Sequence, residues 1–560
     1  MAIAVAGAIA LVASRGSGQA KAVAVAFTRA WARQDYVGMY SLIDPATQRR
    51  LGIVAFADAY RHDDAVASVS SLALSGRVRN GATGTIVVPV LVRTHVFGVV
   101  RASFVLPVSD SGSGERVQWT RRLLFPGLQA GEALSSRLTL PPRAPLLARD
   151  GSILASGPAS DGGYRPSPLG VAAAAVLGTT GPPAPAQQAT LAAEGVPAGA
   201  FVGLSGLELA LDGRLRGSAG GELLAGRRVL ARAVPRAAAP VRSTISPAIQ
   251  LAAVQALGGQ YGGVIVLRPS DGEILAVAGL GLDDTQPPGS TFKMVTVTGV
   301  LEAGIASPAS TFPYATAAVL DGVQLQNANG EDCGGSLTLA FAVSCNSVFA
   351  PLGAKLGAPK LVATAERFGF NHPVGIPGAV ESTLPPAAQI QGDLAVGSTA
   401  IGQDMVLASP LEMATVASTI ADHGLRPQTT VLAGQHLPRI RVTSAAIAHT
   451  VRRLMIDVVR EGTGTSAAIP GVTVAGKTGT AELTTTAPTC PAGATPGSAR
   501  CPTTASANSP QNTDAWFAAF APALDPRIAV CVMLVRDGAG GTTAAPVARQ
   551  VLEAALSTHL

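Results

Sequence analysis

The stretch Gln286-Pro-Pro-Gly-Ser-Thr-Phe-Lys293 places a serine and a lysine three residues apart, directly after a turn-forming segment. Pro-Gly followed by a good N-cap residue predicts that a helix begins here. Because residues i and i+3 share one face of a helix, the ammonium group of Lys293 can reach the hydroxyl of Ser290. The stretch thus predicts a nucleophile with a base beside it, although a lone Ser-x-x-Lys is more often a solvated helix face.

The composition is that of a globular protein with more than one domain. The chain has 560 residues, which indicates about three or four domains, and it is 48% hydrophobic and 14% charged. A net charge of +6 without a Lys/Arg block or a basic–aromatic stripe argues against nucleic-acid binding. The five cysteines lack C-x-x-C spacing and a neighbouring His cluster, so we expect no metal site, and no other cofactor is predicted.

The N-terminus is apolar from residue 1 to residue 13 and is followed by Arg15 and Lys21. This run is shorter than the roughly 20 residues that span a bilayer, and it lacks the basic region of a signal peptide. We interpret residues 1–19 as the remnant of a signal anchor whose first residues are missing from this version of the chain. The alternative is a buried N-terminal helix.

The next two regions carry no catalytic constellation. Residues 20–130 begin with helical spacing and continue as strands, which we expect at 85–92, 96–100, 104–106 and 117–120, so they predict a small α+β cone. Residues 131–240 contain a turn at Asp150-Gly151 between two short strands and are rich in Pro, Ala and Gly, which indicates an extended, non-catalytic domain.

Residues 241–560 predict one α/β/α domain with an antiparallel sheet. A helix is expected at 247–257, a hairpin at 263–277, and helices dominate from 293 to 425. Strands return at 472–475, 515–520 and 528–535, and a helix closes the chain.

A second motif, Ser344-Cys345-Asn346, follows a predicted helical run in this domain. Ser290 is inert at its ordinary pKa and needs a base, which Lys293 can supply if burial and neighbouring cations lower its pKa. Ser344 can relay a proton to a leaving amine, and Asn346 can hold both the lysine and a substrate amide.

The third motif is Lys477-Thr478-Gly479-Thr480, expected at the end of the 472–475 strand. Lys477 adds a positive charge that favours neutral Lys293 and attracts a substrate carboxylate, for which Thr478 and Thr480 offer hydroxyls. Gly479 lets a substrate lie along the strand edge as an added strand. The backbone amides of Ser290 and Thr480 would form an oxyanion hole.

The same segment also fits a phosphate-binding loop, because residues 471–478 read G-x-x-x-x-G-K-T. That loop needs a helix directly after it. Here the inner residues are strand-like and three threonines and Pro488 follow, so no helix is expected to begin where a phosphate would need one.

The three motifs in this order resemble those of serine D,D-transpeptidases, that is, penicillin-binding proteins and serine β-lactamases. The chain looks like a class B penicillin-binding protein at 286–293, 400–403, 409–414, 477–482 and 515–517. Segments 143–155 and 203–217 resemble the pedestal, or dimerisation, domain, although its usual Arg-Gly reads Arg143-Ala144-Pro145. Residues 20–130 resemble the NTF2-like extension of MecA-like members.

The resemblance implies a multidomain α+β protein that cross-links peptidoglycan. Ser290 would attack the penultimate D-Ala carbonyl of a stem peptide, release D-Ala and pass the acyl group to an amine, and β-lactams would acylate Ser290. No glycosyltransferase region is found, so a SEDS-type polymerase is the expected partner. The resemblance places the protein at the cell membrane, with residues 241–560 on the extracytoplasmic side.

Other functions of the same fold remain open. A serine β-lactamase needs fast deacylation, a D,D-carboxypeptidase transfers the acyl group to water, and a scaffolding cell-wall protein would not need the chemistry.

Two cysteine pairs lie close in sequence, which suits an oxidising compartment. We predict a Cys490–Cys501 disulfide in the Thr/Pro/Ala-rich insertion between residues 482 and 514, and Cys333–Cys345 is a second candidate. Cys531 remains as a buried free thiol.

Overall fold

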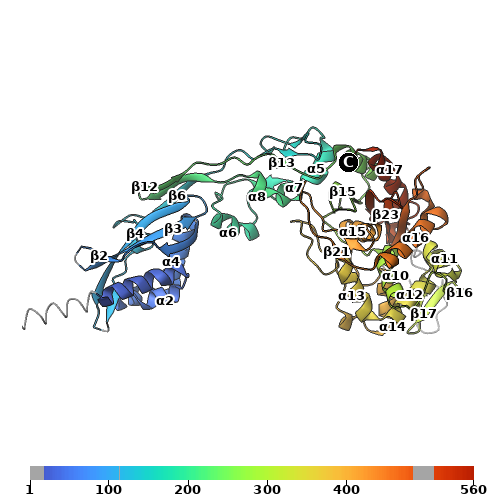
Figure 1. Cartoon of the computed structure of the whole chain (residues 1–560), viewed down its shortest axis with the longest axis horizontal. Helices are drawn as coiled ribbons and strands as arrows, with labels where there is room; N and C mark the ends of the chain where they lie inside the picture. The colour runs from blue at the N-terminus through green and yellow to red at the C-terminus, as the bar shows by residue number, and fades with distance from the viewer. Residues whose placement is uncertain (1–17, 83, 113, 484–509, 560) are drawn as a thin grey trace, which may run out of the picture. The chain divides into compact units, whose positions relative to one another are not determined.

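The computed structural model describes residues 18–82, 84–112, 114–483 and 510–559, and it forms two compact units (Figure 1). The first unit contains the chain up to Ala144 with residues 181–204 and 213–239, and the second contains residues 145–180, 205–212 and 240 onward. Residues 131–240, predicted as one domain, are therefore divided between the units. No helix in the described ranges is long and apolar enough to cross a membrane, and most of the predicted anchor lies outside them.

The first unit packs helices against a five-stranded antiparallel sheet of order β1-β3-β4-β5, with β2 beside β3. Even-numbered residues of β3 and β4 face the core, among them Val88, Val90, Phe104 and Leu106, which have at most 1% exposure. Its elements are a helix at residues 18–32, α2 (Tyr36–Ser41), α3 (Pro45–Arg50), α4 (Ile53–Val66), β1 (Val69–Leu74), β2 (Arg79–Asn80), β3 (Thr85–Thr94), β4 (Val99–Asp110), β5 (Glu115–Val117) and the 3-10 turn η1 (Arg121–Leu123).

Three strand predictions in this unit were wrong in their bounds. The runs at 96–100 and 104–106 form one strand, β4, because residues 95–98 make the turn that returns from β3. The strand expected at 117–120 is β5, which ends at Val117. Strand β1 was missed because only Leu72 of its six residues is buried, so its sequence shows no clear alternation.

A three-stranded antiparallel sheet of order β12-β11-β6 completes the first unit, with helix α6. These elements are β6 (Leu134–Thr139), α6 (Pro185–Ala193), β11 (Gly220–Ala225) and β12 (Arg228–Ala233). Three short elements lie where the chain passes between units: β9 (Thr180–Gly181), β10 (Val202–Gly203) and α8 (Asp212–Leu215).

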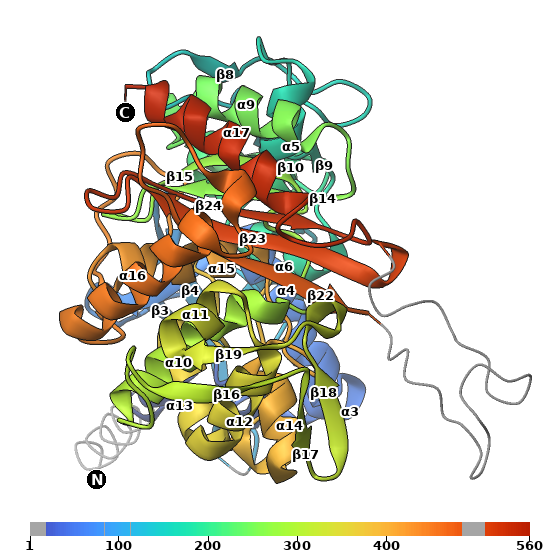
Figure 2. The same cartoon turned by 90° about the vertical axis from the view of Figure 1, so that its right-hand side faces the viewer.

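The second unit is built on a five-stranded antiparallel sheet of order β15-β14-β24-β23-β22. Helices α9 and α17 cover one face, and α15 lies on the other, so the unit has three layers (Figure 2). The strands are buried on both faces and read as continuous apolar runs, which is why the sequence predicted them. The sheet strands are β14 (Gly262–Leu267), β15 (Ile274–Gly279), β22 (Ala475–Glu482), β23 (Thr513–Ala521) and β24 (Ile528–Leu534).

The helices of this unit confirm the predicted helical body. They are α5 (Val171–Leu177), α7 (Gly206–Ala210), α9 (Pro247–Leu257), η2 (Gly289–Phe292), α10 (Lys293–Glu302), η3 (Ala328–Gly330), α11 (Leu337–Ala342), α12 (Asn346–Leu356), α13 (Ala358–Phe368), η4 (Ala387–Gln389), α14 (Gly392–Ala400), α15 (Pro410–Ala421), α16 (Ala445–Glu461), η5 (Thr465–Ala467), η6 (Pro510–Asn512) and α17 (Ala544–Ser557).

Most of the short strands outside the main sheet were not predicted. One group is β7 (Leu146–Leu147) with β8 (Ile153–Ala155) and β13 (Val241–Arg242), of which β7 and β8 had been expected. The other pairs are β16 (Thr311–Ala315) with β19 (Cys333–Ser336), β17 (Ala317–Leu320) with β18 (Val323–Gln326), and β20 (Leu425–Arg426) with β21 (Ile440–Arg441). Strands β16 to β18 are mostly exposed, so their sequences lack an apolar pattern.

The strand predicted at 472–475 was also wrong in its bounds. Pro470 and Gly471 form a tight turn that pairs Ile469 with Val472, so strand β22 begins only at Ala475. The Lys477 motif therefore lies inside an edge strand that is paired along its length with β23. No phosphate-binding loop with a following helix forms here, in agreement with the prediction.

Candidate active site

Ser290 lies in the 3-10 turn η2, which leads directly into helix α10 and confirms the predicted helix start. Gly289 holds this turn with φ +51°, and its amide donates to the carbonyl of Gly402 at 2.9 Å. A Cβ atom on Gly289 would lie 2.7 Å from the Thr480 carbonyl oxygen, and one on Gly402 would lie 2.0 Å from the Gly289 carbonyl oxygen. Gly289 thus lets the Ser290 turn contact strand β22, and Gly402 lets its own segment approach the other side of that turn.

Lys293 is completely buried at the first turn of α10. Its ammonium nitrogen donates to the Ser344 carbonyl at 2.7 Å, to Asn346 Oδ1 at 2.7 Å and to Ser344 Oγ at 3.3 Å. It also lies 5.5 Å from the centre of the Phe349 ring. Burial, and then the positive charge of Lys477, hold the pKa of Lys293 well below its ordinary value.

Lys477 approaches the same serine from strand β22, where it pairs with Ala518 of β23. Its ammonium nitrogen donates to Ser344 Oγ at 2.8 Å and to the Thr478 carbonyl at 3.1 Å, and it lies 5.5 Å from the Phe341 ring centre. Burial lowers the pKa of Lys477 to about 7. The structure therefore brings both predicted lysines to Ser344.

Neither lysine forms an ion pair with a carboxylate in the described part of the chain. A buried ammonium without a counter-ion is costly, which lowers the pKa of both lysines. The pKa of Lys293 is lowered further by the charge of Lys477, so Lys293 is the one that favours the neutral form while Lys477 can still carry its charge. The hydrogen bonds of Lys293 go to Ser344 and Asn346 and not to Ser290, so the predicted contact between Lys293 and the Ser290 hydroxyl is absent from this state. Such contacts often form only when substrate is bound.

Ser344 occupies the link between α11 and α12 in the left-handed region, with φ +64°. A non-glycine residue there is strained and is retained only when its surroundings determine the conformation. The Cys333–Cys345 disulfide connects the residue after Ser344 to β19, and Asn346 Nδ2 donates to the Gln326 carbonyl at 2.8 Å. These two contacts thus fix the Ser344 turn to the strand pairs β16–β19 and β17–β18.

Cysteine pairing agrees with the second of the two predictions. The Cys333–Cys345 disulfide forms, and Cys531 is a buried free thiol. The predicted Cys490–Cys501 pair lies outside the described residues.

The rest of the Lys477 motif is arranged differently from the prediction. Thr478 Oγ1 shares a 2.5 Å hydrogen bond with Thr463 Oγ1 and the residue is only 5% exposed, so its hydroxyl does not stand free for a substrate carboxylate. Thr480 Oγ1 accepts from the Gly540 amide at 3.3 Å. A Cβ on Gly479 would lie 2.6 Å from the Pro288 carbonyl oxygen, so this glycine is needed for contact with the Ser290 turn.

Several residues that shape the site were not singled out from the sequence. Asn327 is buried, donates to the carbonyls of Ala315 and Glu331, and accepts from the Ser347 amide, which orients the start of α12. Phe341 and Phe349 face the two ammonium groups. Gly402 was not singled out either, but the sequence did mark its surroundings, because it belongs to the 400–403 segment that resembles class B penicillin-binding proteins.

A serine on a helix start, two buried lysines without counter-ions and a second serine between those lysines are the groups that an acyl-transfer site needs. The helix supplies Ser290 and Lys293, the α11–α12 link supplies Ser344 and Asn346, and the edge strand supplies Lys477. Together with the three-layer unit around an antiparallel sheet, this defines the class of active-site serine acyltransferases.

Comparisons with known proteins agree with this class. Residues 262–553 match the penicillin binding protein transpeptidase domain, and residues 161–228 match the penicillin-binding protein dimerisation domain. The chain is 35% identical over 427 residues to the peptidoglycan D,D-transpeptidase PbpA of Mycolicibacterium smegmatis, which covers 63% of this chain and 79% of PbpA.

Two crystal structures of PBPA from Mycobacterium tuberculosis are similar as well. One is 30% identical with a TM-score of 0.57 and covers 74% of this chain and 99% of that chain. The other, a penicillin G acyl-enzyme complex, is 29% identical with a TM-score of 0.56 and covers 74% of this chain and all of that chain. This chain belongs to the penicillin-binding protein transpeptidase family.

Proposed function

We propose that this chain is a serine D,D-transpeptidase that cross-links peptidoglycan stem peptides through an acyl-enzyme at Ser290. The observation that carries the proposal is the convergence of two buried lysines on Ser344 next to the Ser290 turn. Support comes from the family match and from relatives named as peptidoglycan D,D-transpeptidases.

In the first half-reaction Ser290 Oγ attacks the penultimate D-Ala carbonyl, and its proton passes to neutral Lys293. The C–N bond to the terminal D-Ala breaks, and the proton on Lys293 passes through Ser344, which Lys477 holds, to the leaving nitrogen, so Lys293 is neutral again. In the second half-reaction an amine of a neighbouring stem attacks the ester. The new C–N bond forms and the C–Oγ bond breaks, while the proton that the amine loses passes through Lys293 to Ser290 Oγ.

The substrate would lie along the open edge of β22, which is the last strand of the sheet. The backbone amides of Ser290 and Thr480 would stabilise the tetrahedral oxyanion, since Gly289 brings the two segments into contact. Lys477 would attract the substrate carboxylate, and Thr480 is the more accessible of the two threonines for binding it. β-Lactams would acylate Ser290 in place of the stem peptide. In support, the similar PBPA structure is a penicillin G acyl-enzyme complex.

The other regions support a membrane-bound enzyme of wall synthesis. We propose an NTF2-like domain at 20–130, a pedestal domain at 131–240 and a transpeptidase domain at 241–560, with a membrane anchor at 1–19 and catalysis on the extracytoplasmic side. The helices packed on the sheet of the first unit and the dimerisation-domain match support this division. A SEDS-type polymerase would supply the glycan strands.

The direct test is labelling of the purified chain with a fluorescent penicillin in wild type, Ser290→Ala and a control variant, Ser557→Ala, at the exposed end of α17. We expect label on the wild type and on Ser557→Ala and none on Ser290→Ala. Label retained by Ser290→Ala would contradict the proposal.

The same labelled protein separates the alternatives. Slow release of the label supports a transpeptidase, whereas rapid turnover indicates a β-lactamase. With a stem-peptide mimic and an added amine, an amide product supports transfer, and hydrolysis alone indicates a carboxypeptidase.

A further inference from the structure

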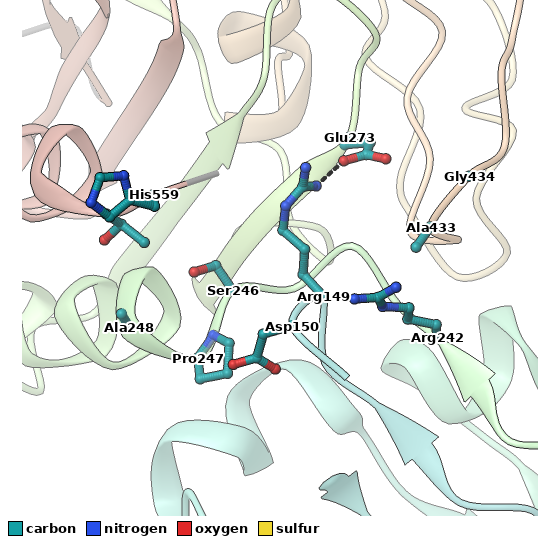
Figure 3. Close-up of a pocket in the computed structure, with 11 residues that line it drawn as sticks. Arg149, Asp150, Arg242, Ser246, Pro247, Ala248, Glu273, Ala433, Gly434 and His559 are labelled. Carbon is teal, nitrogen blue, oxygen red and sulfur yellow. Dashed lines mark hydrogen bonds and ion pairs between the residues drawn. The ribbon is translucent and has the colours of Figure 1, made fainter. Parts of the chain in front are cut away.

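A cavity of about 470 Å³ lies in the second unit at the start of helix α9 (Figure 3). Its wall includes Arg149, Arg242, Ser246, Ala248 and His559, and it contains none of the residues of the candidate active site. The volume is within the range of small-molecule sites, about 300–1,000 Å³. The cavity is therefore separate from the candidate active site.

The start of α9 presents unused hydrogen-bonding groups to this cavity. Ser246 is the N-cap residue, but its side chain caps no amide, and Pro247 at the first helical position has no N–H. The Ser246 side chain forms no hydrogen bond in the described structure although the residue is only 5% exposed. Figure 3 shows its hydroxyl directed into the opening, with the arginines on one side and His559 on the other. The amide of Ala248 is one of the first-turn donors that a helix cannot satisfy internally.

The charged groups of the wall leave cationic donors available. Glu273 is already shared by Arg149 and Arg268, the second contact being 2.6 Å. Asp150 accepts from the Ser152 amide at 2.9 Å and from its hydroxyl at 2.6 Å, and these bonds lower the pKa of Asp150. Glu273 is therefore paired with arginines, whereas Asp150 is held through one oxygen by Ser152 and has Arg242 as its nearby positive charge.

Arg242 is exposed and is in no ion pair within 4 Å among the described residues, although its charge also helps to lower the pKa of Asp150. Arg149 uses one side of its five-donor guanidinium for Glu273. Two guanidinium groups, the unpaired hydroxyl of a largely buried serine and a helix N-terminus with its partial positive charge converge on one cavity. This combination favours an oxyanion.

We propose that this cavity binds the carboxylate or phosphate group of a small ligand, with Arg242 and Arg149 as cationic donors and Ser246 and the Ala248 amide as neutral donors. The group would lie at the N-terminus of α9. Size limits the ligand to a small molecule or to one residue of a larger chain.

The test uses the full chain after acylation with benzylpenicillin, so that the active site is closed to added ligands. Inorganic phosphate and N-acetyl-D-alanine are titrated separately by isothermal titration calorimetry into wild type, Ser246→Ala, Arg242→Gln and a matched control, Arg453→Gln, at an exposed position of α16. Saturable binding to wild type and to Arg453→Gln is expected. A loss of about tenfold or more is expected for Ser246→Ala and for Arg242→Gln, as for a hydrogen bond to a charged group.

The probe that binds identifies whether phosphate or carboxylate is the preferred source of the oxyanion. Binding of neither probe, or equal weakening by Arg242→Gln and Arg453→Gln, overturns the proposal. Thermal melting and penicillin labelling of each variant show that it is folded, and Ser246→Ala removes one oxygen without removing a charge. Unchanged labelling with lost anion binding separates this site from the active site.

Discussion

Two groups of cations in the second unit are built in opposite ways. In the candidate active site, Lys293 and Lys477 are completely buried and converge on a serine without any carboxylate among their partners. Around the α9 cavity, Arg149 and Arg268 share the carboxylate of Glu273. Burial without a carboxylate partner disfavours the charged form of the lysines, whereas the shared carboxylate stabilises the charged form of the arginines.

The difference explains why lysine occupies one site and arginine the other. A lysine loses its proton readily when it is buried, so it can serve as a base near neutral pH. An arginine remains charged in proteins, so its role is to bind and to hold structure. Complete burial without a counter-ion thus distinguishes the two active-site lysines from the paired arginines Arg149 and Arg268.

Replacing the base should give the largest effect. Lys293→Met is expected to lower the rate of penicillin acylation by about 10²- to 10⁴-fold, because a general base contributes about that much. Lys293→Arg should lose as much, because a guanidinium cannot be deprotonated. Stopped-flow or gel-based labelling of folded variants measures both rates, and a nearly normal rate for Lys293→Arg would show that charge, not basicity, is required.

The next largest effect is expected from removing the Cys333–Cys345 disulfide, which should lower the free energy of unfolding. Cys333 and Cys345 are separated by 12 residues, and a loop of that order contributes about 3 kcal/mol to the free energy of unfolding. Cys333→Ala/Cys345→Ala is therefore expected to unfold at lower urea concentration and to label more slowly, since Ser344 and Asn346 lose a constraint.

The matched control for this prediction is Cys531→Ala, which removes the buried free thiol and leaves the disulfide intact. Reductant should destabilise the wild type and Cys531→Ala more than the double variant, in which only the predicted Cys490–Cys501 pair is left to reduce. Equal urea midpoints for the wild type with and without reductant would be evidence that the disulfide has no such role.

Lys477→Met should have a smaller effect on acylation, about 10- to 10²-fold, equivalent to the 1.5–3 kcal/mol of a hydrogen bond to a charged group. The positive charge of Lys477 helps to lower the pKa of Lys293. Its removal should therefore move the midpoint of the pH–rate profile to higher pH. A midpoint that stays in place or falls would argue against electrostatic coupling between the two lysines.

The smallest effect is expected from removing the ion pairs of Arg268 with Asp271 and Glu273, and it should appear in stability only. Arg268→Gln removes one partner of Glu273 and of Asp271 at partly exposed positions, so we expect a loss of about 1 kcal/mol by urea unfolding. The penicillin acylation rate should not change. A tenfold slower acylation would mean that this network also supports the active site.

The sequence predicted the chemistry of the site better than its geometry. Ser290, Lys293, Ser344, Asn346 and Lys477 come from three motifs, and their order was sufficient to place them in one domain. The strands of the central sheet were predictable because they are apolar along their length.

What the sequence did not predict depends on contacts between distant segments. Asn327 orients α12 through backbone groups of two other elements, and no local pattern marks it. The φ of +64° at Ser344 follows from its surroundings and not from its residue type. The engagement of Thr478 by Thr463 likewise arises only when the loop after α16 meets β22.

The central claim is that Lys293 is neutral at the pH where the protein works, and the pH dependence of Ser290 acylation tests it most directly. The measurement is the second-order rate constant for penicillin acylation of the wild type from pH 5 to pH 11, corrected with Ser290→Ala for spontaneous hydrolysis. The rate should fall as pH is lowered through the depressed pKa of Lys293 and be constant above it, with a midpoint well below 10.5. A rate that still rises through pH 10, as for a lysine of ordinary pKa, would contradict the account.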